Sequence, residues 1–377
     1  MPELLKDRYY NFNSIHELAF RIKVIYPSFR DSDFISDIMD ETWEALSLKG
    51  RMRHITINLG KYLPSEYEQA LAVLDQVIAS YPAHHNDLAF IYFPDFVEVY
   101  GQAECNWDLS MAALERYTQC STAEFAVREF IIKHEERMMA QMSIWAKHSN
   151  EHVRRLASEG CRPALPWGQA LARFKKDPTL VLAVLGQLKA DPSLYVRKSV
   201  ANNLNDISKT HPELVVQIAS EWYGQNEYTD WIVKHGCRTL LKRGDKRVLA
   251  IFGVADARHI TVSDFSMRAK SVSIGEEITF SFKVKAKKAA KVRLEYGIHY
   301  VKANGTRNLK IFKIAETSFA AKQEKTYIKK HSFADLSTRK HYPGMHSLTL
   351  IVNGTEQGKL NFEVAAADLF LKLNNLK

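Results

Sequence analysis

The pattern of apolar residues changes once along this chain, near residue 256, and this change constrains the fold more than any other sequence feature. Before it, apolar side chains recur at helical spacing, as in 67–81 (YEQALAVLDQVIASY). After it, short segments alternate apolar and polar residues with period two, as in 278–284 (ITFSFKV). We therefore expect two domains, a helical one at residues 1–256 and a β domain at residues 257–377.

The helical part reads as a series of repeats. Further helices are expected at 108–117, 122–148 (as one long helix), 150–157, 191–200 and 226–234. The last three segments open with polar capping residues, and Pro192 stands at an early helical position of the second. A Val-Arg pair recurs at Val153-Arg154 and Val196-Arg197, about 43 residues apart, which is typical of HEAT or armadillo repeats that stack into a solenoid with a concave surface.

The β part predicts an antiparallel sandwich of immunoglobulin-like type with about seven short strands. Five strands are visible directly, at 278–284, 291–296, 309–314, 347–352 and 360–364. Asn304-Gly305 and Asn353-Gly354 are strong hairpin-turn signals. No cysteine follows Cys237, so an intersheet disulfide is excluded. The tail at 368–377 reads as a short helix or a frayed end.

The formal net charge is +9, and its distribution matters more than its total. Residues 1–103 hold about 9 Lys and Arg against 15 Asp and Glu, and residues 104–256 about 21 against 18. Residues 257–377 hold about 22 against 10. The positive excess in the last third indicates an appended module that binds a polyanion, although a merely soluble basic domain has the same composition.

Several classes of protein are excluded by absent motifs. The chain has no P-loop, G-x-G-x-x-G, G-x-S-x-G or H-E-x-x-H motif and no Cys/His cluster with zinc spacing, so we expect neither a cofactor nor a metal. It has no signal-peptide pattern and no apolar run long enough for a membrane, so we expect a cytoplasmic monomer without membrane contact. The four cysteines are expected to be reduced and structural, with a nucleophilic Cys120 or Cys161 the less favoured alternative.

The most unusual stretch is 156–167 (LASEGCRPALPW). Gly160 is expected to end a helix, which leaves Glu159 at its C-terminus, where the helix dipole disfavours a carboxylate. Two prolines then stiffen the connection to Trp167. Local rules that are broken together indicate a functional site. The alternative is a packed loop between repeats with Trp167 in the core.

At this point a resemblance becomes specific. The segments AEFAVREF (123–130), NEHVRRLASEGCRPALPW (150–167), DPSLYVRKSVANNLNDISK (191–209) and WIVKHGCRTLLKRG (231–244) resemble the HEAT-like-repeat DNA glycosylases. The similarity is greatest to the AlkC branch, which is related to AlkD, and the trailing sandwich resembles the immunoglobulin-like extension of part of that branch. It implies a base-excision repair enzyme that removes cationic alkylated bases from double-stranded DNA and grips the backbone without a deep base pocket.

The resemblance places the active-site carboxylates at Glu124, Glu159 and Asp206 and the aromatic residue at Trp167. It assigns Glu159 to stabilising the sugar cation and positioning water, Trp167 to packing on the sugar or backbone, and the other two acids to support. From the residues alone, alternatives stay open. Glu124 stands four residues before Arg128 and is compatible with a plain helical ion pair. Asp206 is compatible with a solvated helix end.

Basic residues that are candidates for phosphate contact lie in both parts, and ordinary surface charge is the alternative for each. In the helical part they are Arg154, Arg162, Arg197, Lys198, Lys234 and Arg238. In the β part they are Lys302, Arg307, Lys310, Lys313, Arg339, Lys340 and His341. Two other functions remain open from the sequence, a non-catalytic helical-repeat scaffold that binds a protein and a nucleic-acid-binding protein without catalysis.

Overall fold

The chain forms two compact units. The structure is a computed structural model that describes residues 3–82, 88–254, 256–336 and 339–366. The first unit comprises Met1–His211 with Gly224–Gly236, and the second comprises Pro212–Tyr223 with Cys237–Lys377. Expected features at 368–377 lie outside the described residues.

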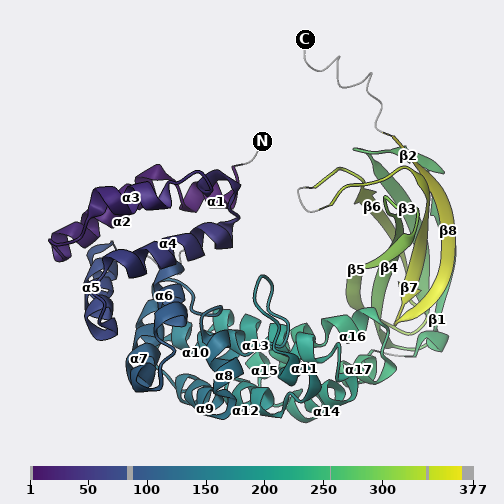
Figure 1. The fold of residues 1–377 in the computed structure, drawn as a ribbon. Helices are drawn as coiled ribbons and strands as arrows, with labels where there is room; N and C mark the ends of the chain where they lie inside the picture. The colour runs from purple at the N-terminus through teal and green to yellow at the C-terminus, as the bar shows by residue number, and fades with distance from the viewer. Residues whose placement is uncertain (1–2, 83–87, 255, 337–338, 367–377) are drawn as a thin grey trace. The chain divides into compact units, whose positions relative to one another are not determined.

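The first unit is helical, and its helices pack mainly against neighbours close in the chain (Figure 1). They are α1 Leu5–Tyr9, α2 Phe12–Ile25, α3 Asp31–Ile38, α4 Leu48–Tyr62, α5 Tyr67–Ser80, α6 Tyr92–Tyr100, α7 Trp107–Tyr117, α8 Val127–Lys133, α9 Glu135–Trp145, α10 Glu151–Gly160, α11 Ala172–Lys176, α12 Thr179–Gln187, α13 Leu194–Ile207 and α15 Glu227–Gly236. Helix α4 packs on α6, α10 on α13, and α13 on α15. Buried apolar faces of successive helices thus form one continuous core.

The repeated Val-Arg pair has the same structural role in two helices. Arg154 Nη1 donates to the carbonyl oxygens six and five residues before it, at 2.9 and 2.7 Å. Arg197 Nη1 does the same at 3.0 and 2.7 Å. Each guanidinium therefore ties the connection that precedes its own helix. Ser193 caps α13, so Pro192 lies just before the helix and not within its first turn, where the sequence predicted it.

The single long helix expected at 122–148 is wrong. The chain turns before α8, and α8 and α9 are separated at His134, whose φ and ψ are −134° and 56°. The His134 ring packs edge-on against Trp107, with ring centroids 5.7 Å apart. This tertiary contact and the two glutamates in the first turn of α9, which suit a helix N-terminus, explain a break that apolar spacing does not reveal.

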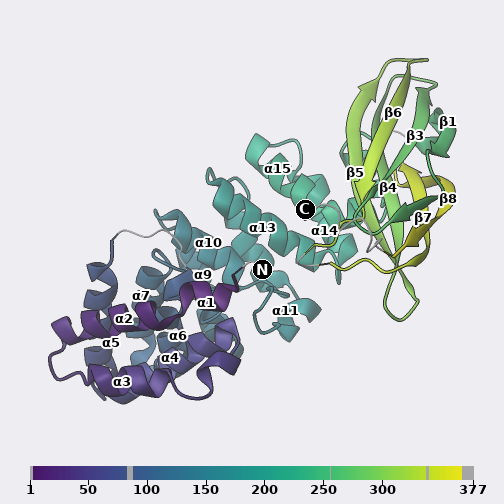
Figure 2. The same ribbon diagram turned by 90° about the horizontal axis from the view of Figure 1, so that it is seen from above.

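The second unit contains three short helices and a β-sandwich (Figures 1 and 2). The helices are α14 Pro212–Trp222, α16 Arg238–Lys242 and α17 Lys246–Ile251. The strands are β1 Ile260–Met267, β2 Ser271–Ser273, β3 Glu277–Ala286, β4 Ala290–Val301, β5 Arg307–Phe319, β6 Glu324–Ser332, β7 Gly344–Val352 and β8 Thr355–Ala365. One sheet has the order β1-β3-β6 and the other β2-β8-β7-β4-β5. All pairs are antiparallel except β2 with β8.

Alternation along the strands builds the sandwich core. Ile278, Phe280, Phe282 and Val284 of β3 are all buried and pack with apolar residues of β4 and β7. The five visible strands are confirmed as β3, β4, β5, β7 and β8. The β7–β8 turn at Asn353-Gly354 has φ values of 49° and 70°, as a type I′ turn requires.

The β7–β8 turn also packs against the connection between α16 and α17 in the same unit. Gly354 faces Gly244, which follows α16, and a Cβ on Gly354 would stand 2.5 Å from the Gly244 Cα. Only glycine allows this backbone approach, because both residues also have positive φ. The connection between α16 and α17, which we expected with the repeats, thus has direct backbone contact with the β7–β8 turn of the sandwich.

Candidate active site

Helix α10 presents a line of charged residues at its surface. Glu151, Arg155 and Glu159 are four residues apart, so they fall on one face of the helix. Asn150 caps the helix by accepting a hydrogen bond from His152 N, at 2.8 Å. The helix ends at Gly160, as predicted. A Cβ there would lie 2.6 Å from the Val127 side chain, so glycine permits the close packing of α8.

Glu159 and Asp206 share one guanidinium, that of Arg162. Arg162 Nη1 lies 2.6 Å from Glu159 Oε1, and its Nη2 and Nε lie 2.8 and 2.9 Å from Asp206 Oδ2. All three side chains are at most 8% exposed. Asp206 reaches this position from α13, which is fixed to α10 because buried Asn203 donates to the Ser158 carbonyl, at 2.9 Å. The alternative of Asp206 as a solvated helix end is therefore wrong.

Glu124 joins the same group through Arg155. Arg155 Nη1 lies 2.5 Å from Glu124 Oε2, and its Nη2 lies 3.6 Å from Glu159 Oε1. The hydroxyl of Thr122 donates to Glu124 Oε2, at 2.9 Å. The expected alternative, a helical ion pair of Glu124 with Arg128, is wrong, because Glu124 lies in the turn before α8 and Arg128 points into the protein interior. We call Glu124, Glu159 and Asp206 the carboxylate cluster.

The carboxylate cluster is balanced in charge. Its three acids contact Arg155, Arg162 and Lys209, whose Nζ lies 2.8 Å from Asp206 Oδ1. Burial opposes the charge of Arg155 and Arg162, but the neighbouring carboxylates outweigh it and hold the pKa of both guanidinium groups above the usual value. These cations therefore stay charged at neutral pH.

The carboxylate oxygens are not used equally. Both oxygens of Asp206 are engaged, one by Arg162 and the other by Lys209. The two guanidinium groups that reach Glu159 both contact Oε1. Among the described residues, no ion pair or hydrogen bond reaches Glu159 Oε2 or Glu124 Oε1. These two oxygens are the ones left for a water molecule or a substrate cation.

Trp167 stands on a loop between α10 and α11. Its side chain is 61% exposed, so the alternative of a core tryptophan is wrong. Its backbone is left-handed, with φ of 62°. The Trp167 carbonyl accepts a hydrogen bond from Lys49 Nζ of α4, at 3.1 Å. The loop thus presents a large aromatic surface to solvent.

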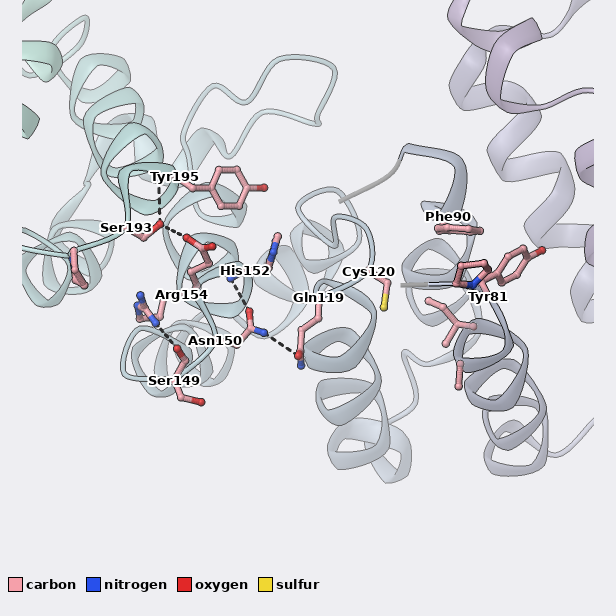
Figure 3. Close-up of a pocket in the computed structure, with 15 residues that line it drawn as sticks. Tyr81, Phe90, Gln119, Cys120, Ser149, Asn150, His152, Arg154, Ser193 and Tyr195 are labelled. Carbon is pink, nitrogen blue, oxygen red and sulfur yellow. Dashed lines mark hydrogen bonds between the residues drawn. The ribbon is translucent and has the colours of Figure 1, made fainter. Parts of the chain in front are cut away.

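An open groove of about 1200 Å³ lies beside the N-terminal ends of α10 and α13 (Figure 3). Tyr81 and Phe90 line one side, and the N-terminal ends of α10 and α13, with His152 and Tyr195, line the other. The Tyr195 ring lies 5.2 Å from the guanidinium carbon of Arg155. Tyr195 thus links the lining of the groove to Arg155 of the charged group, while Glu124, Glu159 and Asp206 are not among the residues that line it.

The expected phosphate-binding residues differ in their surroundings. Arg162 belongs to the buried group described above, and Arg154 pairs with Asp191 at 2.7 Å. Arg197 lies over the Tyr228 ring, at 4.3 Å, and Arg339 donates to the Tyr300 hydroxyl. These cations hold the protein together, and a phosphate contact by any of them stays a prediction.

Other candidates are exposed or partly exposed. Six are exposed to solvent: Lys198, Lys302, Arg307, Lys310, Lys313 and Lys340. Lys234 and Arg238 are partly buried and make interactions within the protein. His341 is buried. Arg307, Lys310 and Lys313 lie on β5, an edge strand of the sandwich. The exposed group is the better source of phosphate contacts.

Other chemistries find little support. Burial raises the pKa of the Cys161 thiol to about 12 and that of Cys120 above its usual value, so neither is a thiolate at neutral pH. In the described part of the chain, no group of three or more His, Cys, Asp or Glu side chains is arranged to hold a metal ion. None of the described helices combines the length and apolar character that crossing a membrane requires.

Sequence reasoning missed Arg155, Lys209, Thr122 and Arg128. Arg155 is four residues before Glu159 and Lys209 three after Asp206, so helical spacing carried a signal for both. Thr122 donates to Glu124 within a turn. Arg128 donates to main-chain carbonyls more than 30 residues away, and no local sequence pattern indicates such a contact.

Comparison with family models gives two matches. A model described as "DNA alkylation repair enzyme" matches residues 51–240. A model described as "Uncharacterised protein YhaZ, C-terminal Ig-like domain" matches residues 261–366. The first spans the whole carboxylate cluster, and the second spans the β-sandwich.

Two individual proteins are similar over almost the whole chain. The uncharacterized protein YhaZ of Bacillus subtilis (strain 168) is 48% identical over 355 residues, which are 94% of this chain and 98% of that protein. The solved structure of Pseudomonas fluorescens alkylpurine DNA glycosylase AlkC, bound to DNA containing an abasic site analog, has a TM-score of 0.90 and 36% identity. That match covers 97% of this chain and 100% of the other.

Proposed function

The chain belongs to the DNA alkylation repair enzyme family, with a C-terminal immunoglobulin-like domain, and on that premise we propose that it is a DNA glycosylase of base excision repair. Its substrates are cationic alkylated bases in double-stranded DNA, such as 3-methyladenine, 3-methylcytosine and 1-methyladenine. The observation that carries the proposal is the convergence of Glu124, Glu159 and Asp206 from three separate segments. An exposed tryptophan, Trp167, follows five residues after Arg162 in the chain.

The chemistry of a cationic base suits this residue set. A positively charged base is already a good leaving group, so strong general-acid help is not required. As the glycosidic bond breaks, positive charge develops on the deoxyribose, as in an oxocarbenium-like transition state. A fixed carboxylate stabilises that charge and orients the attacking water, and an aromatic face attracts a cation.

The free carboxylate oxygens support a division of roles. Glu159 Oε2 is the oxygen that meets the sugar cation or water, because Oε1 is held by Arg162 and Arg155. Glu124 contributes negative potential from its own unengaged oxygen. Asp206 has both oxygens occupied, so it acts as a positioning residue that orients Arg162 and, through it, Glu159.

The open groove supports a grip on the DNA backbone without a deep pocket for the base. It is lined by aromatic and polar side chains, and the exposed Trp167 supplies a further flat surface for the sugar or backbone. Exposed basic residues of the sandwich, such as Arg307 and Lys310, are proposed to add phosphate contacts. An open surface of this kind is suited to binding DNA that is bent at the damaged base pair.

Glu159→Gln tests the proposal directly. The substitution keeps the size of the side chain and removes its charge, so release of 3-methyladenine should fall by about 100-fold or more while DNA affinity changes little. Chromatography of free bases measures release, and fluorescence anisotropy measures binding. Glu129→Gln is the control, because Glu129 forms a partly exposed helical ion pair with Lys133 and lies neither in the carboxylate cluster nor in the lining of the groove.

Undiminished excision by Glu159→Gln refutes the role of Glu159. Two other outcomes identify the competing functions. DNA binding without any base release identifies a nucleic-acid-binding protein without catalysis. Absence of both DNA binding and base release favours a helical-repeat scaffold that binds a protein.

A further inference from the structure

We propose that Arg128 is a positioning residue for the reaction, because it fixes the loop at 161–171 that carries Arg162 and Trp167. This inference rests on the proposed function and extends it to a side chain that touches neither the carboxylates nor the proposed substrate. Its guanidinium connects three main-chain carbonyls around that loop.

The hydrogen bonds of Arg128 reach both ends of the loop. Its Nη1 donates to the Gly160 carbonyl at 2.8 Å, and its Nη2 donates to the Arg162 carbonyl at 2.9 Å. Its Nε donates to the Gln169 carbonyl at 2.5 Å. One rigid group from α8 therefore holds the end of α10, the residue that carries the Glu159–Asp206 bridge, and the chain just beyond Trp167.

Burying the charged guanidinium of Arg128 costs free energy unless its N–H groups find hydrogen-bond acceptors. Arg128 is 1% exposed, and its charge is satisfied by carbonyl oxygens with no ion pair to a carboxylate among the described residues. Burial lowers the pKa of its guanidinium to about 10, so it still carries a proton at neutral pH. A buried cation without an acidic partner destabilises the fold, so its presence needs a reason other than stability.

The conformation of the loop at 161–171 supplies that reason. Trp167 has a left-handed backbone, which costs free energy for a residue other than glycine and persists only where its surroundings hold it. Arg128 holds one side of the loop, and Lys49 Nζ holds the Trp167 carbonyl from another helix. Inside the loop, Leu171 N donates to the Pro163 carbonyl at 3.2 Å.

Only a guanidinium fits these three acceptors. Its N–H groups diverge in a fixed plane and reach separate oxygens at once, whereas a lysine ammonium is a single point of donation on a flexible stem. Arg128→Lys therefore keeps the charge but releases part of the loop. A shift of about 1 Å in the reacting groups lowers a rate by about 100-fold.

The experiment compares Arg128→Lys with Arg51→Lys. Arg51 is also 1% exposed and donates to main-chain carbonyls, of Trp43 at 3.2 Å and Tyr10 at 2.8 Å, but these lie in the N-terminal part of the chain, and Arg51 also forms ion pairs with Asp7 and Glu44. Both variants should lose stability to urea, so Arg51→Lys controls for the loss of stability alone. Single-turnover release of 3-methyladenine and DNA affinity are measured for each.

A spectroscopic readout separates the loop from the chemistry. The protein is labelled with 5-fluorotryptophan, and the ¹⁹F resonance of Trp167 is assigned with Trp167→Phe. We expect Arg128→Lys to shift that resonance and to lower the single-turnover rate about 100-fold, with DNA affinity changed less than about threefold. Arg51→Lys should change neither the resonance nor the rate.

The proposal is overturned if the Trp167 resonance does not move in Arg128→Lys, or if Arg51→Lys lowers the rate as much. Should Arg128→Lys not fold, Arg128→Gln provides the second test, since it removes the buried charge and most of the donors to the loop and should shift the same resonance and slow release. If the wild-type protein releases no base, the proposed function fails, and the ¹⁹F comparison still decides whether Arg128 holds the loop.

Discussion

Removing the guanidinium between Glu159 and Asp206 should be one of the most damaging single changes in the helical unit. Arg162→Met keeps much of the side-chain volume but leaves two carboxylates facing each other without their shared cation. All three side chains are at most 8% exposed, so solvent screens the repulsion poorly. We expect a loss of about 3–5 kcal/mol in the free energy of unfolding, as for other buried pairs with one partner removed.

Urea denaturation followed by circular dichroism at 222 nm measures this loss, since the signal comes mainly from the helical unit. Arg116→Met is the control, because Arg116 pairs with Asp75 at 2.6 Å but both side chains are about one third or more exposed. Its cost should be below about 1 kcal/mol. Adding Glu159→Gln to Arg162→Met should restore part of the stability, because one of the two carboxylates that lost Arg162 becomes neutral and the repulsion between them ends. Equal costs for the two single variants, or no recovery in the double variant, would refute the electrostatic reasoning.

Two further predictions concern the sandwich. Lys310→Ala should lower the magnitude of the slope of log DNA affinity against log salt concentration by about 1, because one phosphate contact is lost. Lys288→Ala, which changes another exposed lysine, should leave the slope unchanged. Anisotropy titrations from about 50 to 200 mM salt measure both slopes. Burial lowers the pKa of His331 to about 4, and its ring nitrogens contact the Tyr296 and Tyr300 hydroxyls at 2.9 and 2.6 Å. The folded state therefore resists the proton that the unfolded state accepts near pH 6.5, and the sandwich should lose about 2 kcal/mol between pH 7.5 and 5. The opening free energies of β4 and β6 amides, obtained from hydrogen exchange after correction for the intrinsic pH dependence of the exchange rate, should show this loss in the wild type and less of it in His331→Gln. Opening free energies that do not change with pH would contradict it.

Much of the fold follows from local patterns. The segment 67–81 is helical because its apolar residues share one face, and the Asn353-Gly354 turn forms because both residues accept positive φ. Strand β6 was not identified from the sequence, since it is a lysine-rich edge strand with little apolar alternation. The break at His134 depends on a contact with Trp107 of another helix, which is not encoded in neighbouring residues.

The candidate site also combines residues that the sequence indicates with contacts that only the folded chain shows. The resemblance proposed the three carboxylates and Trp167 as site residues, whereas Arg155 was missed although it stands four residues before Glu159. The contacts of Arg162 with Asp206 and of Lys49 with the Trp167 carbonyl join residues 44 and 118 positions apart. Such pairings appear only when the chain is folded, because α10 and α13 are brought together by packing.

The proposed glycosylase activity is measured by incubating the wild-type protein with methylated double-stranded DNA and quantifying the free bases released. We expect free 3-methyladenine in amounts that match the abasic sites left in the DNA, and loss of both products in Glu159→Gln but not in Glu129→Gln. DNA that is bound but yields no free base and no abasic sites would contradict it.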